Sequence, residues 1–336
     1  MAILEFYRLD ASAELIGAID CSFVPKAGKH TYGLDRFWSG VAGRAKQGLE
    51  ISLLSLINTL SGEAWSLYAE QTPSGLVQSE GAQSQYTRID HYLNHWRSCL
   101  CKLKTVRYFA ADGFYAKRKV FDAFEQAGKY LITKLRSDAD LRYLFKGEHQ
   151  NGKKGRKRLY DGKVFFDDLN RWENAGPNEK YPHLHMYTQI LNSPRFKRNF
   201  RVVLLLNSRS NQYVLLISTD LELPASKIVY YYQLRFQIEF LFRDAKQFAG
   251  LNHCQARGPQ KLHFHFNLSL AAINLAKLHM KLNQTSRSFN DFARKAYNQR
   301  LLNWLFSKLS PETDLHLNQA LFQQAVQFGT MHQPPN

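Results

Sequence analysis

Apolar runs with the length of strands alternate with segments of helical period through the first two thirds of the chain. The predicted strands cover residues 16–24, 48–60, 64–70, 105–111, 130–135, 159–166, 186–191, 200–206 and 213–219. The predicted helices of this part cover residues 86–103 and 115–126, and residues 25–40 are predicted to form a surface loop. From residue 225 onward the pattern is helical, with helices expected over 230–246, 261–282 and 289–309. This order indicates an α/β protein that ends in helices.

The same order resembles that of a ribonuclease H-like domain, in which a strand and a hairpin precede alternating helices and strands. By this analogy we expect a mixed sheet flanked by helices. Composition changes after Asp140 to a polar, basic and turn-rich segment, so a β-rich insertion is expected before the last helix of the core. The predicted parts are residues 1–139 and 213–285 for the core, 140–212 for the insertion, and 286–336 for a C-terminal helical region with a frayed tail.

Composition narrows the class of partner. The 336 residues are 44% hydrophobic and 13% aromatic, which is typical of a globular chain. They carry 45 basic and 28 acidic side chains, a formal net charge of +17, and nucleic acid is the commonest partner of so basic a protein. A membrane-surface or ribosome-associated protein would also fit this charge. There is no run of about eighteen apolar residues and no secretory signal, so we expect a cytoplasmic protein without a membrane partner.

The segment from Tyr230 to Lys246 is the most informative part of the chain. As one helix it would have a buried apolar stripe formed by Leu234, Ile238, Leu241, Ala245 and Phe248. A second face would gather one carboxylate among groups that donate hydrogen bonds or carry positive charge, namely Tyr232, Arg235, Glu239, Arg243 and Lys246. An exposed salt-bridge ladder on an ordinary helix explains the charges as well. The alternative is that this polar face binds a polyanion.

Four of these residues have the spacing Y-x-x-R-x-x-x-E, followed by six residues and K. The pattern at Tyr232, Arg235, Glu239 and Lys246 resembles the Y-R-E-K signature of DDE transposases related to insertion sequence 4. Two further acids have contexts similar to the other members of the triad in that family: Asp20, in A-I-D-C-S-F, and Asp112, in Y-F-A-A-D-G-F-Y. Both are expected at strand ends, where each could also simply cap a turn.

The resemblance implies a metal-dependent enzyme that cuts and joins DNA. Hard divalent ions prefer carboxylate oxygens, and a pair of them can stabilise the attacking and leaving oxygens of a phosphodiester. We therefore expect two Mg²⁺ ions, for which Mn²⁺ would substitute, with Asp20 bridging both ions and with Asp112 and Glu239 each holding one side. Tyr232, Arg235, Arg243 and Lys246 would contact DNA.

The resemblance also implies partners and a bacterial, nucleoid-associated location. Double-stranded DNA, as the terminal inverted repeats and the target, and a homodimer assembled on that DNA are expected from the family. Only nineteen residues precede Asp20, so the N-terminal DNA-binding region of such enzymes is expected to be mostly missing. Three other functions remain open: an inactive or truncated DNA-binding relic, a ribonuclease H-like nuclease without strand transfer, and a ribosome-type RNA binder. Cys21, Cys99, Cys101 and Cys254 lack a C-x-x-C spacing and are expected to be reduced thiols.

Overall fold

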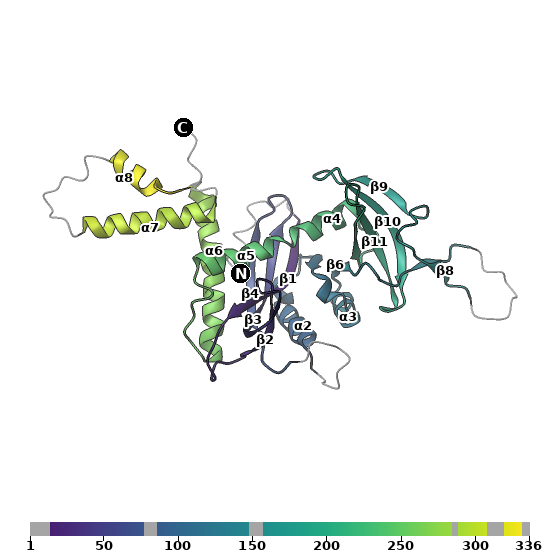
Figure 1. The fold of residues 1–336 in the computed structure, drawn as a ribbon, viewed down its shortest axis with the longest axis horizontal. Helices are drawn as coiled ribbons and strands as arrows, with labels where there is room; N and C mark the ends of the chain where they lie inside the picture. The colour runs from purple at the N-terminus through teal and green to yellow at the C-terminus, as the bar shows by residue number, and fades with distance from the viewer. Residues whose placement is uncertain (1–13, 77–85, 148–156, 284–287, 308–318, 331–336) are drawn as a thin grey trace. The chain divides into compact units, whose positions relative to one another are not determined.

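The computed structural model describes residues 14–76, 86–147, 157–283, 288–307 and 319–330 (Figure 1). The chain divides into two compact units, Met1–Glu239 and Phe240–Asn336. Part of the predicted frayed tail, residues 331–336, lies outside the described residues.

The core of the first unit is a five-strand arrangement in the order β4-β3-β1-β5-β6. The strands are β1 (Leu15–Pro25), β3 (Arg44–Asn58), β4 (Ala64–Gln71), β5 (Tyr108–Ala111) and β6 (Tyr130–Leu135). The first three are antiparallel, whereas β5 runs parallel to both β1 and β6. The helices between the parallel strands are the crossovers that such pairs require. This is the strand order of a ribonuclease H-like sheet, so the predicted fold class is confirmed.

The segment predicted to be the insertion extends the same sheet. Its strands are β7 (Arg142–Leu144), β8 (Tyr160–Lys163), β9 (Glu173–Pro177), β10 (Leu184–Ser193) and β11 (Arg198–Asn207). They join the core through β12 (Tyr213–Ser218), which pairs with β6 on one side and β11 on the other. Among the described residues, twelve strands form one continuous sheet. The short strands β7 and β9 were not predicted, because their few residues show no clear alternation.

Two predictions about the N-terminal part were wrong. Residues 25–40, predicted to be a loop, contain the strand β2 (Asp35–Ser39), which pairs with the start of β3. Asp20 was predicted at a strand end but lies in the middle of β1, opposite Leu53. Both differences have one cause: β3 is fifteen residues long, so it supplies backbone partners to the whole of β1 and then to β2.

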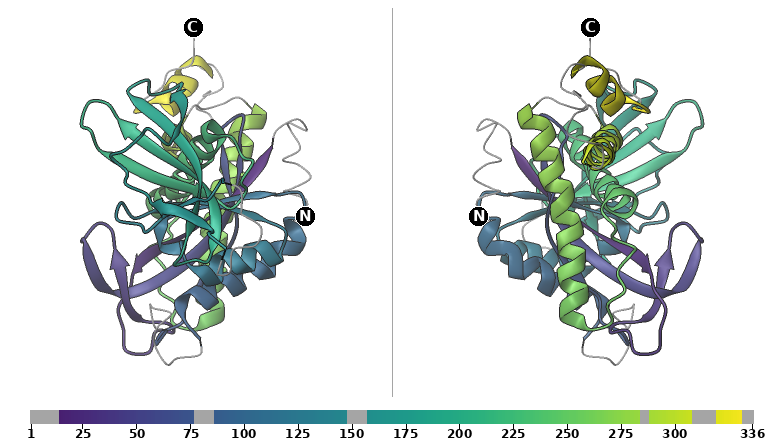
Figure 2. Two further views of the ribbon diagram at one scale, coloured as in Figure 1. Left: turned by 90° about the vertical axis from the view of Figure 1, so that its right-hand side faces the viewer. Right: turned by 90° about the vertical axis from the view of Figure 1, so that its left-hand side faces the viewer.

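Helices α2 (Arg88–Cys99) and α3 (Arg118–Gln126) cover one face of the sheet (Figure 2). Helix α2 begins at a capping box, in which the Thr87 side chain accepts from the Asp90 backbone N–H and Asp90 accepts from the Thr87 N–H. The core beneath these helices includes Trp96, stacked on Phe124, and Ile19 of β1. Because side chains alternate along a strand, Asp20 faces the opposite side of the sheet from Ile19.

The predicted helix over residues 230–246 is two helices in the structure. Helix α4 (Ala225–Leu234) ends before Arg235, and α5 (Gln237–Phe248) begins after Phe236. Between them the backbone bonds span three residues, as in the donation from the Ile238 N–H to the Arg235 carbonyl at 3.1 Å. Three-residue bonds wind the chain more tightly than an α-helix, so the prediction of one continuous polar face was wrong. In the predicted apolar stripe, Phe248 is exposed and the other four residues are buried.

The second unit continues from α5 into α6 (Pro259–Asn283), α7 (Phe289–Phe306) and α8 (Gln319–Gln327). The helical pattern predicted for 261–282 and 289–309 is confirmed over most of its length. Within the described ranges, no helix combines the length and apolar character needed to span a bilayer. All four cysteines are free thiols, as predicted.

Candidate active site

Asp20 is the carboxylate at the centre of the candidate site. It lies in mid-strand on β1, and its side chain is 19% exposed. One carboxylate oxygen, Oδ1, accepts from the Cys21 backbone N–H at 2.8 Å. The other, Oδ2, accepts from Nη1 of Arg235 at 2.9 Å. A buried carboxylate requires such partners, because desolvating an unpaired charge is costly.

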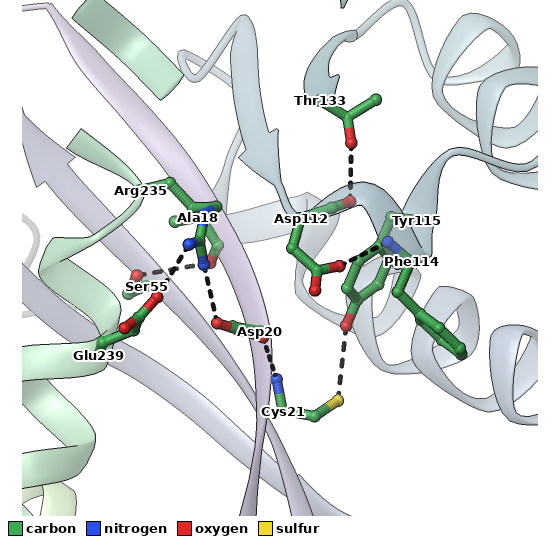
Figure 3. A network of polar contacts seen from close by, with 10 residues as sticks. All are labelled: Ala18, Asp20, Cys21, Ser55, Asp112, Phe114, Tyr115, Thr133, Arg235 and Glu239. Carbon is green, nitrogen blue, oxygen red and sulfur yellow. Dashed lines mark hydrogen bonds and ion pairs between the residues drawn. The ribbon is translucent and has the colours of Figure 1, made fainter. Parts of the chain in front are cut away.

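Arg235 joins two of the predicted acids (Figure 3). Its second terminal nitrogen, Nη2, donates to Oε1 of Glu239 at 2.8 Å, one helical turn along the chain. The guanidinium therefore bridges an acid of the sheet and an acid of α5. A rigid planar fork suits this double contact, which a lysine ammonium could not reproduce with the same geometry.

Asp112 follows the last residue of β5, as predicted. Its Oδ1 accepts from the Phe114 N–H at 2.8 Å, which caps the short helix η3 (Gly113–Tyr115). Its backbone carbonyl accepts from the Thr133 hydroxyl at 2.7 Å, so the turn is attached to β6. Because β1 and β5 are parallel neighbours, the turn after β5 comes close to β1, and Figure 3 shows Asp112 beside Asp20. Asp112 thus caps a turn, as the sequence allowed, and it also lies at the candidate site.

The carboxyl groups influence one another electrostatically. Burial, together with the negative charge of Asp112, raises the pKa of Asp20 from 3.8 to about 7, although Arg235 opposes this shift. Burial also raises the pKa of Asp112, against the effect of the Phe114 N–H and of Arg235. Burial would lower the pKa of Arg235, but Asp20, Tyr232 and Glu239 raise it. Arg235 therefore stays positively charged among acids that repel each other.

Tyr232 belongs to the same group. Its ring centre lies 5.8 Å from the guanidinium carbon of Arg235, as in a cation–π contact. Burial raises the pKa of its hydroxyl, as do the charges of Asp112 and Asp20, while Arg235 lowers it. Tyr232, Arg235, Glu239 and the two aspartates are thus electrostatically connected within the first unit.

The remaining two predicted residues, Arg243 and Lys246, lie on α5 in the second unit. Nε and Nη2 of Arg243 both donate to Oδ1 of Asp244, at 3.0 and 2.9 Å, and its guanidinium carbon lies 4.6 Å from the centre of the Phe240 ring. Burial lowers the pKa of the Lys246 ammonium. The structure thus gives Arg243 an acidic partner next to it in sequence, which the helical arc did not predict.

Sequence reasoning missed a group of polar residues on the helix-covered side of β1. The Cys21 thiol lies 3.5 Å from the hydroxyl of Tyr115, in the turn that follows Asp112. Nearby, Glu50 of β3 is buried and its Oε1 accepts from the hydroxyls of Tyr92 and Thr72. The available signal was position: Cys21 and Tyr115 come one and three residues after the two aspartates. These contacts connect the strand of Asp20 to the turn of Asp112.

The donor chemistry of the site fits hard divalent cations. Burial, and after it the negative charge of Asp112, raises the pKa of Asp20, and a cation held at this carboxylate would favour its charged form. In the structure the Arg235 guanidinium provides part of that positive charge. Across the described part of the chain, no three acidic, histidine or cysteine side chains are grouped closely enough to hold a metal ion.

A sheet of the ribonuclease H type with acids on β1, after β5 and on a later helix defines a class of nucleic-acid-processing proteins. The model of the family described as "Transposase DDE domain" matches residues 13–275, and the chain belongs to this family. No curated protein matches the chain.

Solved structures with some likeness are nucleases. An endonuclease V of Ciona intestinalis, in complex with an inosine-containing DNA, is 13% identical, with 79% of this chain and 88% of that chain covered and a TM-score of 0.30. The catalytic domain of human endonuclease V is 9% identical, with coverage of 80% and 86% and a TM-score of 0.32. The NurA nuclease of Sulfolobus solfataricus is 11% identical, with coverage of 80% and 85% and a TM-score of 0.28. Scores this low carry no inference about activity.

Proposed function

We propose that the chain is a DDE transposase of the insertion sequence 4 superfamily, which cuts DNA at insertion-sequence ends and joins the freed 3′-hydroxyl to target DNA. The observation that carries this proposal is the contact between Arg235 and Asp20, which are 215 positions apart in sequence. The same guanidinium holds Glu239, so the R and E of the Y-R-E-K pattern meet the first acid of the proposed triad.

In this proposal Asp20, Asp112 and Glu239 hold two Mg²⁺ ions, for which Mn²⁺ substitutes. When bound, such a pair neutralises charge on a phosphodiester and supports both the attacking and the leaving oxygen. All three acids offer the oxygen ligands that these ions prefer, and no sulfur or imidazole group competes in the set. The acids come from a strand, a strand end and a helix, so the fold fixes their positions before DNA arrives.

Arg235 would change partners when a phosphate enters the site. Its charge is held by the surrounding acids, and its planar donors match two phosphate oxygens. With Asp20 and Glu239 holding cations, the Arg235 guanidinium would be free to bind phosphate, next to the Tyr232 ring. Arg243 and Lys246 would contact the DNA further along α5. A homodimer assembled on the two DNA ends would bring both cut strands to the target.

The chemistry takes two displacements at phosphorus. In the first, water attacks the phosphodiester at the element end, and the bond to the 3′ oxygen breaks, leaving a 3′-hydroxyl. In the second, that hydroxyl attacks a target phosphodiester, and the target strand's own 3′ oxygen leaves with the proton. Asp20, Asp112 and Glu239 would serve both displacements, because negative charge develops on the phosphoryl oxygens in each displacement.

The test uses supercoiled plasmid that carries the element's terminal repeats, incubated with MgCl₂ or MnCl₂. Asp20→Asn, Asp112→Asn and Glu239→Gln should each lower cleavage by at least about a thousandfold, as expected for loss of a metal ligand. The matched control is Glu125→Gln, an exposed carboxylate on α3 that pairs with Arg198. Near-normal cleavage by a variant would remove that acid from the site. Cleavage without joined products in the wild type would reduce the function to that of a nuclease.

A further inference from the structure

Lys134 lies next to Asp112 in the sheet. Strands β5 and β6 are parallel, and Ala110 of β5 lies opposite Ile132 of β6. The backbone of Asp112 is still extended, with φ −72° and ψ 174°, so the same register places Asp112 opposite Lys134. The Thr133 hydroxyl, which donates to the Asp112 carbonyl at 2.7 Å, holds the two strand ends together. The position of Lys134 relative to Asp112 is therefore set by the pairing of their strands.

Asp20, Asp112 and Lys134 form one row across three neighbouring strands. The parallel pairing of β1 with β5, continued by one residue, places Asp20 opposite Asp112. Neighbouring strands are about 4.8 Å apart, so the backbone of Lys134 lies about 10 Å from that of Asp20. Figure 3 shows Arg235 on one side of Asp20 and Asp112 on the other. Along this row the two aspartates thus have Arg235 at one end and Lys134 at the other.

The side chain of Lys134 is on the same face of the sheet as that of Asp20. Leu135, the next residue of β6, belongs to the core that contains Ile19 of β1. Because side chains alternate along each strand, Lys134 and Asp20 both point to the opposite face. On that face Ile132 is fully buried, whereas Lys134 is exposed. Lys134 is therefore accessible to a ligand that lies over the acids.

The charge of Lys134 is available to such a ligand. Within the described parts of the chain its ammonium forms no ion pair, in contrast to Arg136, which pairs with Asp138 at 2.9 Å. The acid beside it in register, Asp112, accepts from the Phe114 N–H. Exposure is ordinary for a lysine, and the place beside two acids is what distinguishes this one. A phosphate near those acids is repelled by them, and a lysine ammonium offsets this repulsion as a point charge.

We propose that Lys134 binds a backbone phosphate of the DNA strand that continues past the cut, on the flanking side. The inference rests on the proposed function, which assigns the element end to Tyr232 and Arg235. A strand that is held by Arg235 and crosses the two aspartates reaches Lys134 next. One strand of DNA advances about 3.4 Å per nucleotide, so about 10 Å corresponds to about three nucleotides. Lys134 thus holds the flanking DNA while the element end is held on the other side of the acids.

The experiment measures the affinity of the full chain for two fluorescent duplexes, in EDTA and over a series of KCl concentrations. One duplex carries the terminal repeat and ends at the cleavage position, and the other continues past it by about six base pairs, which is enough to reach Lys134. The wild type should bind the longer duplex about threefold or more tightly. Lys134→Gln should lose most of this preference and lower the salt slope for the longer duplex by about 1, because one phosphate contact is lost. Lys134→Arg, which keeps the charge, should retain the preference.

Lys104→Gln is the matched control. This exposed lysine precedes β5, at the end of the strand away from Asp112, and its removal should change both affinities by less than about twofold, because distant exposed charges are screened. Three results would overturn the inference: a wild type that binds both duplexes equally, a Lys134→Gln variant that keeps the preference or loses affinity for both duplexes alike, and an equal loss in Lys104→Gln. If the wild type binds neither duplex, the proposed function itself fails.

Discussion

Arg235 donates to Asp20 at 2.9 Å and so links the turn between α4 and α5 to the middle of β1. The contact forms at the tight turn between α4 and α5, where the backbone leaves α-helical spacing. The turn is therefore part of the site's construction, because it supplies both Arg235 and, one turn later, Glu239.

Replacing Arg235 tests whether its charge or its shape matters. Arg235→Ala should lower cleavage by about ten- to a hundredfold, because a charged hydrogen-bond donor to Asp20, Glu239 and phosphate is lost. Arg235→Lys should recover part of this loss, since the charge returns without the bidentate geometry. Initial cleavage rates with saturating MgCl₂ measure the effect. If all three proteins cleave at one rate, Arg235 has no role at the scissile phosphate.

Asp20 should make folding stability depend on pH when divalent ions are removed by EDTA. Its folded pKa is raised to about 7 from 3.8, so between these values the folded state holds a proton that the unfolded state releases. The stability contributed by this group is therefore present at low pH and is lost as pH rises from about 4 to about 7. Asp20→Asn removes this dependence. The melting temperature of the variant should therefore rise relative to that of the wild type as pH increases from about 4 to about 7. A difference that stays constant from pH 4 to pH 8 would contradict the raised pKa.

Tyr115 should act as a positioning residue for the two aspartates. Tyr115→Phe removes the 3.5 Å contact with the Cys21 thiol and so loosens the turn of Asp112 relative to β1. The MgCl₂ concentration needed for half-maximal cleavage should rise by about three- to tenfold, as for other residues that orient metal ligands. Tyr213→Phe is the control, because its hydroxyl donates to the exposed Ser137 carbonyl. If Tyr115→Phe needs the same Mg²⁺ concentration as the wild type, the contact between Tyr115 and Cys21 does not position the aspartates.

Glu50 should stabilise the fold by accepting hydrogen bonds from the hydroxyls of Tyr92 and Thr72. Tyr92→Phe leaves the buried carboxylate with the Thr72 hydroxyl at 2.9 Å and should cost about 1–3 kcal/mol of unfolding free energy. Tyr86→Phe is the matched control, since its hydroxyl, which accepts from Asn94, belongs to an exposed residue and its loss should cost little. Urea unfolding of both variants measures the difference. Equal midpoints would show that the buried carboxylate does not depend on Tyr92.

Much of the fold followed from local patterns. The hairpin of β3 and β4, the strands β5, β6, β10, β11 and β12, and the helices α2, α3, α6 and α7 lie where apolar periodicity predicted them. The errors occurred where partners elsewhere decided the structure. β2 formed because β3 offered it a free edge, and Asp20 became a mid-strand residue for the same reason. Neither pairing can be predicted from the local sequence of the residues that form it.

The sequence by itself determined the order of the elements, the spacing of Tyr232, Arg235, Glu239 and Lys246, and the basic charge, because each is a property of neighbouring residues or of composition. The tertiary structure alone decided that Arg235 contacts Asp20 and that Asp112 stands beside Asp20. These relationships depend on which strands pair and in which register. Strand pairing brings together residues far apart in the chain, and local periodicity carries no information about that choice.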